Sequence, residues 1–430
     1  MIRAAFRNFF SLLLALLARA IIKKYRPQIV MVTGSVGKTS TKDAVAAVLS
    51  EKFFLRASEK SYNSEIGVPL TIFGSKNPWS NMLVWLRVFE EALALIIFPN
   101  HYPKLLVLEV GADRPGDLAR ILKIATPDAV VVTHLPEVPV HVEAYASPQA
   151  VRDEEFTPAY ALPPDAPLIV SADDGHSREM AEKLEARVLT FGFDEDADVR
   201  VEHPTLYEED GEPSGMQADF VYLKKKHRVV VHGALGKAQL LAPAAAFALA
   251  ASLGLSLSEI QEGLSRYVPP PGRNRMLHGL NGSLIIDDSY NASPAAMRES
   301  LSGLCLLARE KRRIAVLGDM LELGRYSSEE HERIGKLVVS CADVLVTVGI
   351  RARAIGAAAR HEGMKEENIF SYASAHEAAK HLKDIIGKDD AVLIKGSQSI
   401  RTERIVSELL AHPEDKKKLV RQEREWQLIK

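Results

Sequence analysis

The segment VTGSVGKTSTKD at residues 32–43 constrains the fold of this chain more than any other feature. An apolar, β-branched run leads into it from Gln28, and helix-forming residues follow it. Glycines around a Lys-Thr pair, between a strand and a helix, are typical of a loop that binds phosphate groups. The unit therefore predicts a parallel α/β layer near the start of the chain.

The loop is shorter than the common pattern G-x-x-x-x-G-K-[ST]. Val32 stands where that pattern requires glycine. We expect Lys38 to reach the β- and γ-phosphates and the Thr39 hydroxyl to face Mg²⁺. A kinase or a GTPase is compatible with the loop taken alone. The predicted nucleotide site consists of Gly34, Ser35, Gly37, Lys38, Thr39 and Ser40.

Further apolar runs predict a multidomain α/β protein, since 430 residues are too many for one ordinary core. Continuous runs at 28–33, 105–110, 129–133 and 167–171 suit buried parallel strands. Alternation between 197 and 233 predicts an antiparallel hairpin, and an alanine-rich helix follows. This first domain spans residues 26–273.

The stretch YVPPPGRNRM at 267–276 predicts a hinge, because prolines and glycine interrupt regular structure there. A second α/β series follows in residues 274–412. Its apolar runs at 283–288, 313–319, 343–349 and 390–397 end in Gly, Asp or Ser, where the carboxyl ends of parallel strands bind ligands. Residues 413–430 are highly charged and predict a solvated helix.

The N-terminal residues 1–25 predict a basic, apolar helix. The apolar run from Phe9 to Ala18 is about half as long as a bilayer span requires. Three interpretations are open: a helix packed on the domain, a helix on a membrane surface, and a signal peptide. We disfavour the signal peptide because a nucleotide-binding strand begins a few residues later. The apolar stretch 80–103 keeps membrane contact open, although packing explains it better.

The overall composition points away from several classes of protein. A formal net charge of −2 gives no reason to expect nucleic acid as a partner. Cys305 and Cys341 are the two cysteines, and neither lies in a C-x-x-C motif. A disulfide framework and a zinc–cysteine site are therefore not expected, and a reducing compartment is the simpler interpretation.

Six further motifs follow the loop in order: SYNSEIGVPLTIFG (61–74), LEVGADRPGDL (108–118), THLPEVPVHVEAYAS (133–147), IDDSYNASP (286–294), VLGDMLELG (316–324) and IKGSQSIRTER (394–404). Together with the short loop, this series resembles the Mur ligase family from about residue 26 to about residue 410. The resemblance implies a P-loop central ATPase domain followed by a Rossmann-like C-terminal domain. It also accounts for the loop, because this family uses the pattern G-[ST]-x-G-K-[TS].

The resemblance implies an ATP-dependent ligase that forms an amide bond through an acyl phosphate. Such an enzyme joins D-alanyl-D-alanine or another amine to a carboxylate of a peptidoglycan precursor. ATP and Mg²⁺ are the expected cofactors. Phosphoryl transfer mainly requires positioning and neutralised charge, which Lys38 and two Mg²⁺ ions would supply.

The family pattern assigns further residues to this chemistry. Thr39 and Glu109 would hold one ion, and His141 would help hold the second. Arg273 would reach the γ-phosphate as the domains close, with Asp288 at the ribose and Asn291 near the nucleotide. Asn63 would lie near the acceptor, and Lys395 and Ser397 would lie on the side of the amine substrate.

Structural roles are the alternatives for several of these residues. Glu109 would then be an ordinary carboxylate at a strand end, and His141 a structural histidine. Asp287 and Asp288 would cap a helix. Lys395 would be a surface cation at the end of a strand.

The chain departs from the family pattern in three places. About 25 residues precede the first nucleotide strand, where the family carries a uridine-binding domain. Glu155 stands where the family has a carbamylated lysine that bridges the metals, and we expect it or a neighbour to take that role; the alternative is a solvated acidic helix. Ala238 and Gln239 replace a histidine–asparagine pair near the base.

Two classes of function follow. The first is a working ligase, either on peptidoglycan precursors or as a membrane-associated ligase that makes a poly-amino-acid chain. The second is a nucleotide-binding scaffold that has lost turnover. We favour the ligase, acting on nucleotide and peptidoglycan-precursor-like molecules in the cytoplasm. Two interpretations are not decided by the sequence. Residues 1–25 could contact the inner face of the membrane, and a protein partner could replace the uridine-binding domain.

Overall fold

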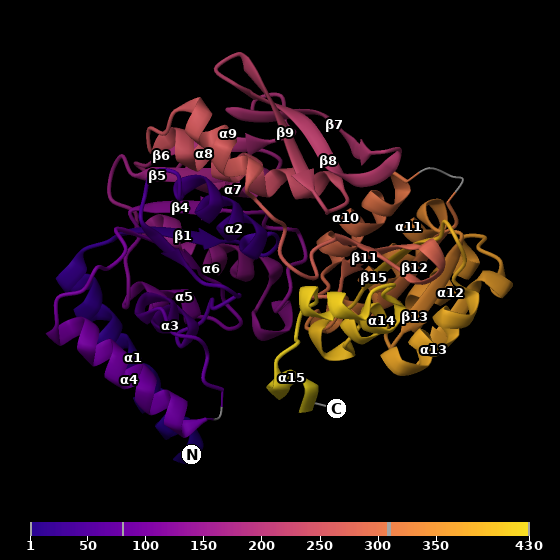
Figure 1. Ribbon diagram of the computed structural model, residues 1–430, viewed down its shortest axis with the longest axis horizontal. Helices are drawn as coiled ribbons and strands as arrows, with labels where there is room; N and C mark the ends of the chain where they lie inside the picture. The colour runs from indigo at the N-terminus through magenta and orange to yellow at the C-terminus, as the bar shows by residue number, and fades with distance from the viewer. Residues whose placement is uncertain (1, 80, 308–310, 429–430) are drawn as a thin grey trace.

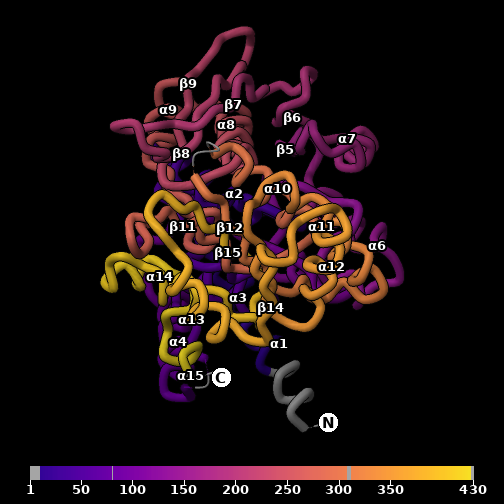
Figure 2. The backbone as a smooth tube through the Cα atoms, turned by 90° about the vertical axis from the view of Figure 1, so that its right-hand side faces the viewer, coloured from indigo at the N-terminus to yellow at the C-terminus, as the bar shows by residue number. Residues whose placement is uncertain are grey.

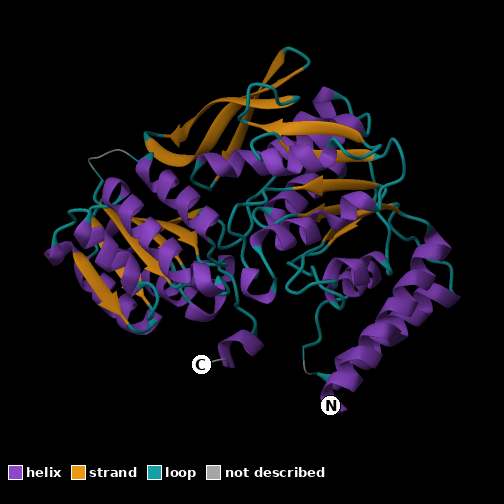
Figure 3. Ribbon diagram, turned by 180° about the vertical axis from the view of Figure 1, so that it is seen from behind, coloured by secondary structure: helices purple, strands orange, loops and turns teal. Residues whose placement is uncertain are grey.

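The computed structural model describes residues 2–79, 81–307 and 311–428, without the side chains of residues 2–9 and 428. The described residues form two sheets with helices on both faces (Figures 1 and 3). The first sheet has the strand order β2-β3-β1-β4-β5-β6-β7-β8-β9. Its strands are β1 Gln28–Thr33, β2 Leu55–Ala57, β3 Leu105–Glu109, β4 Ala129–Val132, β5 Pro167–Ser171, β6 Arg187–Gly192, β7 Val199–Glu209, β8 Glu212–Tyr222 and β9 Lys225–His232.

Alternate residues of β1 face two separate helix layers. Val30 and Val32 pack with helices α2, α8 and α9, whereas Ile29 and Met31 pack with α1 and α3 to α7. Burial on both faces explains why this strand is apolar throughout. The helices of this part are α1 Ile2–Tyr25, α2 Lys38–Leu49, α3 Gly67–Phe73, α4 Met82–Ile97, α5 Asp117–Leu122, α6 Pro148–Tyr160, α7 Gly175–Ala181, α8 Leu241–Ser252 and α9 Leu257–Ser265.

The strands β7, β8 and β9 extend the first sheet in antiparallel fashion. The expected hairpin is thus a three-stranded unit. Figure 2 shows it at the opposite end of the molecule from α1. Its inward residues, among them Val201, Met216 and Phe220, pack against α8.

The second sheet has the order β10-β11-β15-β12-β13-β14 and is parallel except for β10. Its strands are β10 Arg275–His278, β11 Leu284–Asp288, β12 Arg313–Gly318, β13 Val344–Val348, β14 Ile369–Tyr372 and β15 Ala391–Lys395. Its helices are α10 Pro294–Cys305, α11 Ser327–Cys341, α12 Arg353–His361, α13 Ala375–Ile385 and α14 Glu403–Leu409, with α15 Arg424–Leu428 near the C-terminus.

Helix α1 packs on the first domain and lies beside α4 (Figure 1). Leu14, Ala18 and Ile21 are fully buried, and burial of a large aliphatic side chain contributes about 1.5–3 kcal/mol. Lys24 donates hydrogen bonds of 2.9 and 3.0 Å to the carbonyls of Leu95 and Ile96, which end α4. Of the interpretations of this segment, packing on the domain is the one that the structure shows. Within the described residues, no helix is both long and apolar enough to cross a bilayer.

The C-terminal segment is a solvated helix, as its charge predicts, over only part of its length. Residues 413–418 form a short, largely exposed 3-10 helix, and α15 follows at Arg424. Leu419 is buried in the core of the second domain, and Arg421 is only 8% exposed. Burial of these two residues holds the segment on the protein, so the expectation of a solvated helix was wrong for residues 419–421.

The two cysteines form a disulfide that the sequence did not predict. Cys305 and Cys341 end the neighbouring helices α10 and α11, with their Cα atoms 4.7 Å apart. Helix packing brings them together across a separation of 36 residues. The expectation against a disulfide was therefore wrong for this pair.

Candidate active site

A cleft of about 650 Å³ lies between the two sheets. The first domain contributes the phosphate-binding loop and the residues that follow β3 and β4. The second domain contributes the segments that follow β11, β12 and β15. The lining includes Ser35, Gly37, Lys38, Thr39, Asn63, Glu109, His141, Arg273, Asn291 and Ser397 from the expected site.

The phosphate-binding loop has the backbone that its glycines permit. Gly34 and Gly37 have φ of +115° and +90°, which L side chains rarely adopt. A Cβ on Gly34 would lie 2.3 Å from Oγ1 of Thr133 on the neighbouring segment. The loop therefore lies tightly against the end of β4, and α2 begins directly after it at Lys38.

Glu155 lies under the loop rather than in solvent. It is 2% exposed on α6, and its Oε2 accepts hydrogen bonds from Thr33 Oγ1 at 2.9 Å and from Gly34 N at 3.3 Å. Its Oε1 is 3.4 Å from Nζ of Lys38, which also donates to the carbonyl of Gly34. The alternative of a solvated acidic helix is wrong for Glu155, whereas Asp153 is an exposed neighbour.

Thr39 lies at the centre of a polar cluster. Its Oγ1 is 2.7 Å from Ser61 Oγ, 3.2 Å from Glu109 Oε1 and 3.4 Å from Nη2 of Arg273. The Arg273 guanidinium stacks on the Tyr290 ring with 4.0 Å between Cζ and the ring centroid. The hinge arginine thus reaches the first helical turn after the loop.

The donors around Thr39 fit a magnesium ion. Glu109 is 2% exposed, and its Oε2 has no hydrogen-bond partner. The Oγ atom of Ser35 is also buried without a hydrogen-bond partner. Burial raises the pKa of Glu109, and nearby Lys42, Lys38 and Arg273 oppose this. A hard cation would satisfy the unpaired oxygen and favour the ionised carboxylate. Within the described residues, no group of three or more His, Cys, Asp or Glu side chains forms a complete metal site by itself.

His141 joins the two domains across the cleft. Its Nδ1 is 2.6 Å from Oε2 of Glu322, and its Nε2 is 3.5 Å from Oδ1 of Asp113. Burial opposes the charged ring, but Glu322 and Asp113 outweigh it and raise the pKa of His141. His141 and Glu322 have φ of 65° and 63°, a conformation that is uncommon outside glycine and that often accompanies function.

Asp288 and Lys395 pair with each other. Nζ of Lys395 is 2.5 Å from Oδ2 of Asp288 and 3.0 Å from the carbonyl of Asn291. The Lys395 side chain is 2% exposed and the Asp288 side chain is 6% exposed, and neither lines the cleft. The alternative of a surface cation is wrong for Lys395, because it lies at the buried ends of adjacent strands β15 and β11.

Three further expected residues line the cleft: Asn63, Asn291 and Ser397. Asn63 accepts a hydrogen bond from Gly111 N through its carbonyl, next to the end of β3. Asn291 Oδ1 accepts from Gln398 N at 3.4 Å, and Ser397 Oγ accepts from Leu321 N at 2.9 Å. Ser40 is absent from the cleft lining, although Lys38 and Thr39 of the same helix line it.

Comparison with protein families agrees with this geometry. The Mur ligase middle domain matches residues 32–85 and 90–250, and the domain described as "Mur ligase, glutamate ligase domain" matches residues 272–398. A UDP-N-acetylmuramoyl-tripeptide–D-alanyl-D-alanine ligase of Mycobacterium bovis is 30% identical over 407 residues, which cover 89% of this chain and 73% of the relative. The chain belongs to the Mur ligase family.

Other members of the Mur ligase family extend the comparison. The Bacillus subtilis enzyme of the same name is 25% identical over 399 residues, and the match covers 92% of this chain and 79% of that enzyme. The MurF ligase of Thermotoga maritima, solved with ADP, is 27% identical with a TM-score of 0.76, and the match covers 94% of this chain and 84% of that one. The predicted family, its fold class and an ATP-dependent ligase are confirmed.

Sequence reasoning missed several residues of the cleft. Glu322 lies in the motif VLGDMLELG, but nothing in the sequence predicts that it contacts His141 across the cleft. Tyr290 is inside the motif IDDSYNASP, and its ring supports Arg273. Trp426 also lines the cleft. It was missed because the charged composition of the C-terminal segment predicted exposure to solvent.

Proposed function

We propose that this protein forms an amide bond between the carboxylate of a UDP-linked muramoyl peptide and the amine of D-alanyl-D-alanine. ATP supplies the driving force through an acyl phosphate. The relatives named for these substrates support the assignment. The convergence of Lys38, Thr39, Glu109 and Arg273 in one cleft carries the proposal, because it provides phosphate-binding and cation-binding groups at the same place.

The reaction balances in two steps. A carboxylate oxygen of the acceptor attacks the γ-phosphorus, and the bond to the β,γ-bridging oxygen breaks, so that ADP leaves with the electron pair. The amine nitrogen then attacks the acyl carbon, the carbon–oxygen bond to phosphate breaks, and the nitrogen loses a proton. Inorganic phosphate and the amide are the products.

The chain's own groups supply positioning and charge. Lys38 begins α2 beside the loop, where its ammonium offsets negative charge on the transferred phosphoryl group. Arg273 adds a second cation from the hinge, held in place by the Tyr290 ring. Bound Mg²⁺ would neutralise further phosphate charge, and Thr39 and Glu109 are the residues that would hold it.

The set of preserved groups argues against a degenerate scaffold. Lys38, Thr39, Glu109 and Arg273 come from the loop, β3 and the hinge, and packing alone does not require polar groups of this kind to converge. A membrane-associated poly-amino-acid ligase is also less favoured, since the matched relatives are named for peptidoglycan precursors.

Phosphate release tests the proposal. Purified protein is given ATP and Mg²⁺ with UDP-N-acetylmuramoyl-tripeptide and D-alanyl-D-alanine, singly and together. We expect phosphate only with both substrates, and none above background from Lys38→Ala. Lys336→Ala is the matched control, because that side chain is 62% exposed on α11. ATP binding without any phosphate release would contradict the proposal and favour the scaffold.

We further propose that Glu155 takes the part of the family's carbamylated lysine. Its carboxylate is buried beside Lys38 and the loop, which supports this role. Glu155→Gln keeps the shape but removes the charge, so we expect turnover to fall and the Mg²⁺ dependence to change. Asp153→Asn, an exposed neighbour on the same helix, is the control. The role is excluded if Glu155→Gln leaves both quantities intact.

A further inference from the structure

A second cavity of about 580 Å³ opens into the cleft beside the phosphate-binding loop. The linings of the two cavities share Thr39, Ser61, Arg273, Tyr290, Gln398 and Trp426. Its walls come from the hinge, the segments around residues 59–62 and 77–79, and the C-terminal residues 417–426. We call it the tryptophan pocket, because Trp79 and Trp426 both line it.

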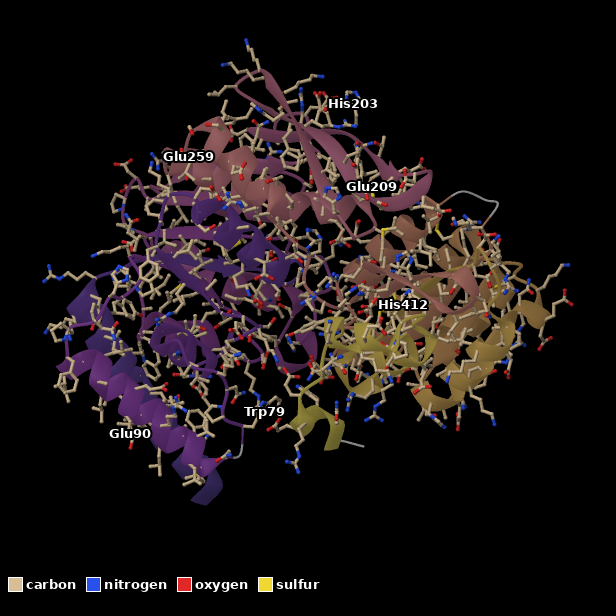
Figure 4. The ribbon with its side chains drawn as sticks, in the orientation of Figure 1. Trp79, Glu90, His203, Glu209, Glu259 and His412 are labelled. Atoms are coloured by element: carbon tan, nitrogen blue, oxygen red, sulfur yellow. A yellow bond between two sulfur atoms is a disulfide. The ribbon has the colours of Figure 1, made fainter. Side chains whose placement is uncertain are left out.

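Trp79 is presented by a loop with a fixed backbone. Its amide donates to Oδ1 of Asn77 at 2.9 Å, and its carbonyl accepts from Nε1 of Trp85 at 2.9 Å. The amide of Asn77 donates in turn to the Tyr62 hydroxyl at 3.0 Å. Figure 4 shows Trp79 next to the C-terminal segment.

Trp426 is delivered by a segment that is anchored on the other domain. Nη1 of Arg421 donates to Oε2 of Glu403 and to the carbonyl of Ser289, both at 3.1 Å. Val420 packs on the hinge so closely that a Cβ on Gly272 would lie 2.8 Å from its Cγ1. The anchored segment therefore places Trp426 at the boundary between the pocket and the cleft.

The two walls meet across the cleft. The rings of Trp79 and Trp426 form an edge-to-face pair with 5.6 Å between their centroids, and Lys60 forms an ion pair with Glu423. Trp79 and Lys60 belong to the first domain, whereas Trp426 and Glu423 follow the second. An edge-to-face pair leaves ring faces available for other groups.

The chemistry of the lining suits an anionic ligand with apolar or flat groups. The cationic residues of the pocket are Lys60, Arg273, Lys417 and Arg421, against the carboxylates Glu59 and Glu423. Pro270, Pro271 and Leu419 add apolar surface. The pocket opens at Thr39 and Arg273, where the acceptor carboxylate must meet the γ-phosphate.

We propose that the tryptophan pocket binds the peptide of the acceptor, with Trp79 and Trp426 as residues that determine acceptor specificity. The inference rests on the proposed ligase function and adds a subsite to it. The acceptor chain lies against the indole rings, Arg273 and Lys417 attract its free carboxylate groups, and its reacting carboxylate points towards Lys38. The incoming amine approaches through the cleft, which Ser397 lines.

Intrinsic fluorescence tests binding without turnover, because Trp79, Trp85 and Trp426 are the three tryptophans of the chain. UDP-N-acetylmuramoyl-tripeptide is titrated into the full-length protein with ADP and Mg²⁺. We expect quenching in wild type and in Trp85→Phe, and a smaller quench in Trp79→Phe and in Trp426→Phe, because each of these variants loses one of the two reporting rings. A quench that is the same in all variants, or that D-alanyl-D-alanine produces instead, overturns the assignment.

Steady-state kinetics tests the effect on catalysis. Trp79→Ala and Trp426→Ala should each raise the KM for the acceptor about 10- to 100-fold, as expected for loss of a large buried contact, and leave the KM for ATP within twofold. Arg424→Ala, an exposed residue on α15, is the control and should match wild type. An unchanged acceptor KM in both tryptophan variants overturns the subsite while the ligase stands. Absence of turnover in wild type would instead contradict the proposed function itself.

Discussion

The buried pair between Lys395 and Asp288 gives the sharpest stability prediction. Lys395→Met removes the ammonium and leaves the Asp288 carboxylate in a site where it is about 6% exposed. Removal of one partner of a buried ion pair costs about 3–5 kcal/mol, because the other charge loses its compensation. For a domain of this size, that loss lowers the melting temperature by roughly 6–20 °C.

The double variant separates this mechanism from simple loss of packing. In Lys395→Met with Asp288→Asn, neither charge remains; the asparagine carbonyl can still accept from Asn274 N, and its amide group can donate to Ser300 Oγ. We therefore expect the double variant to be more stable than Lys395→Met alone. Urea unfolding, followed by circular dichroism at constant pH, measures all four members of the cycle. If the losses of the two single variants simply add, the two charges are not coupled and the reasoning is wrong.

Two further predictions concern other buried groups. Burial raises the pKa of Asp287 to about 6. The folded protein therefore binds a proton that the unfolded chain releases, and stability falls as the pH rises through 6. Asp287→Asn removes this loss. Between pH 5 and pH 7.5, the free energy of unfolding of this variant should therefore rise by about 1–1.5 kcal/mol relative to wild type, which melting temperatures would report. Parallel pH profiles of the two proteins would contradict this. Cys305→Ser should cost about 3–4 kcal/mol in oxidising buffer, judged by urea unfolding, and the difference should vanish in dithiothreitol.

The parallel strands of both sheets could be predicted because they are buried on both faces. The runs at 28–33 and 167–171 coincide with β1 and β5, since continuous apolar sequence leaves few other arrangements. The strands β2 and β14 were missed, because three or four half-buried residues carry no clear periodicity. Their pairing depends on neighbouring strands that already exist.

The phosphate-binding loop was predictable because its chemistry is local. Gly34, Gly37, Lys38 and Thr39 lie within six residues, and their roles follow from one turn of backbone. The partners of these residues were not predictable in the same way. Glu155 lies 117 residues from Lys38, and only the packing of α6 brings its carboxylate beneath the loop. A family pattern pointed to the position, whereas burial showed which of three adjacent carboxylates faces inward.

Charge composition misled at the C-terminus because a few residues decide the course of a segment. Between 413 and 428 most side chains are polar, and no periodic apolar face is present. Leu419, Arg421 and Trp426 nevertheless fix the segment on the hinge and the cleft. A guanidinium that satisfies backbone carbonyls can anchor a chain as firmly as an apolar side chain, and no hydropathy pattern detects it.

The carboxyl-end rule explains both the success and the limit of the site prediction. It correctly places Glu109 at the carboxyl end of β3 and Asp288 at the carboxyl end of β11, the edge of a sheet at which α/β proteins commonly bind ligands. It does not say whether a side chain at such an edge faces the cleft or a neighbouring strand. Glu109 keeps a buried oxygen without a partner, whereas both oxygens of Asp288 accept hydrogen bonds from the protein. Of these two carboxylates, Glu109 therefore has the stronger physical reason to bind a cation.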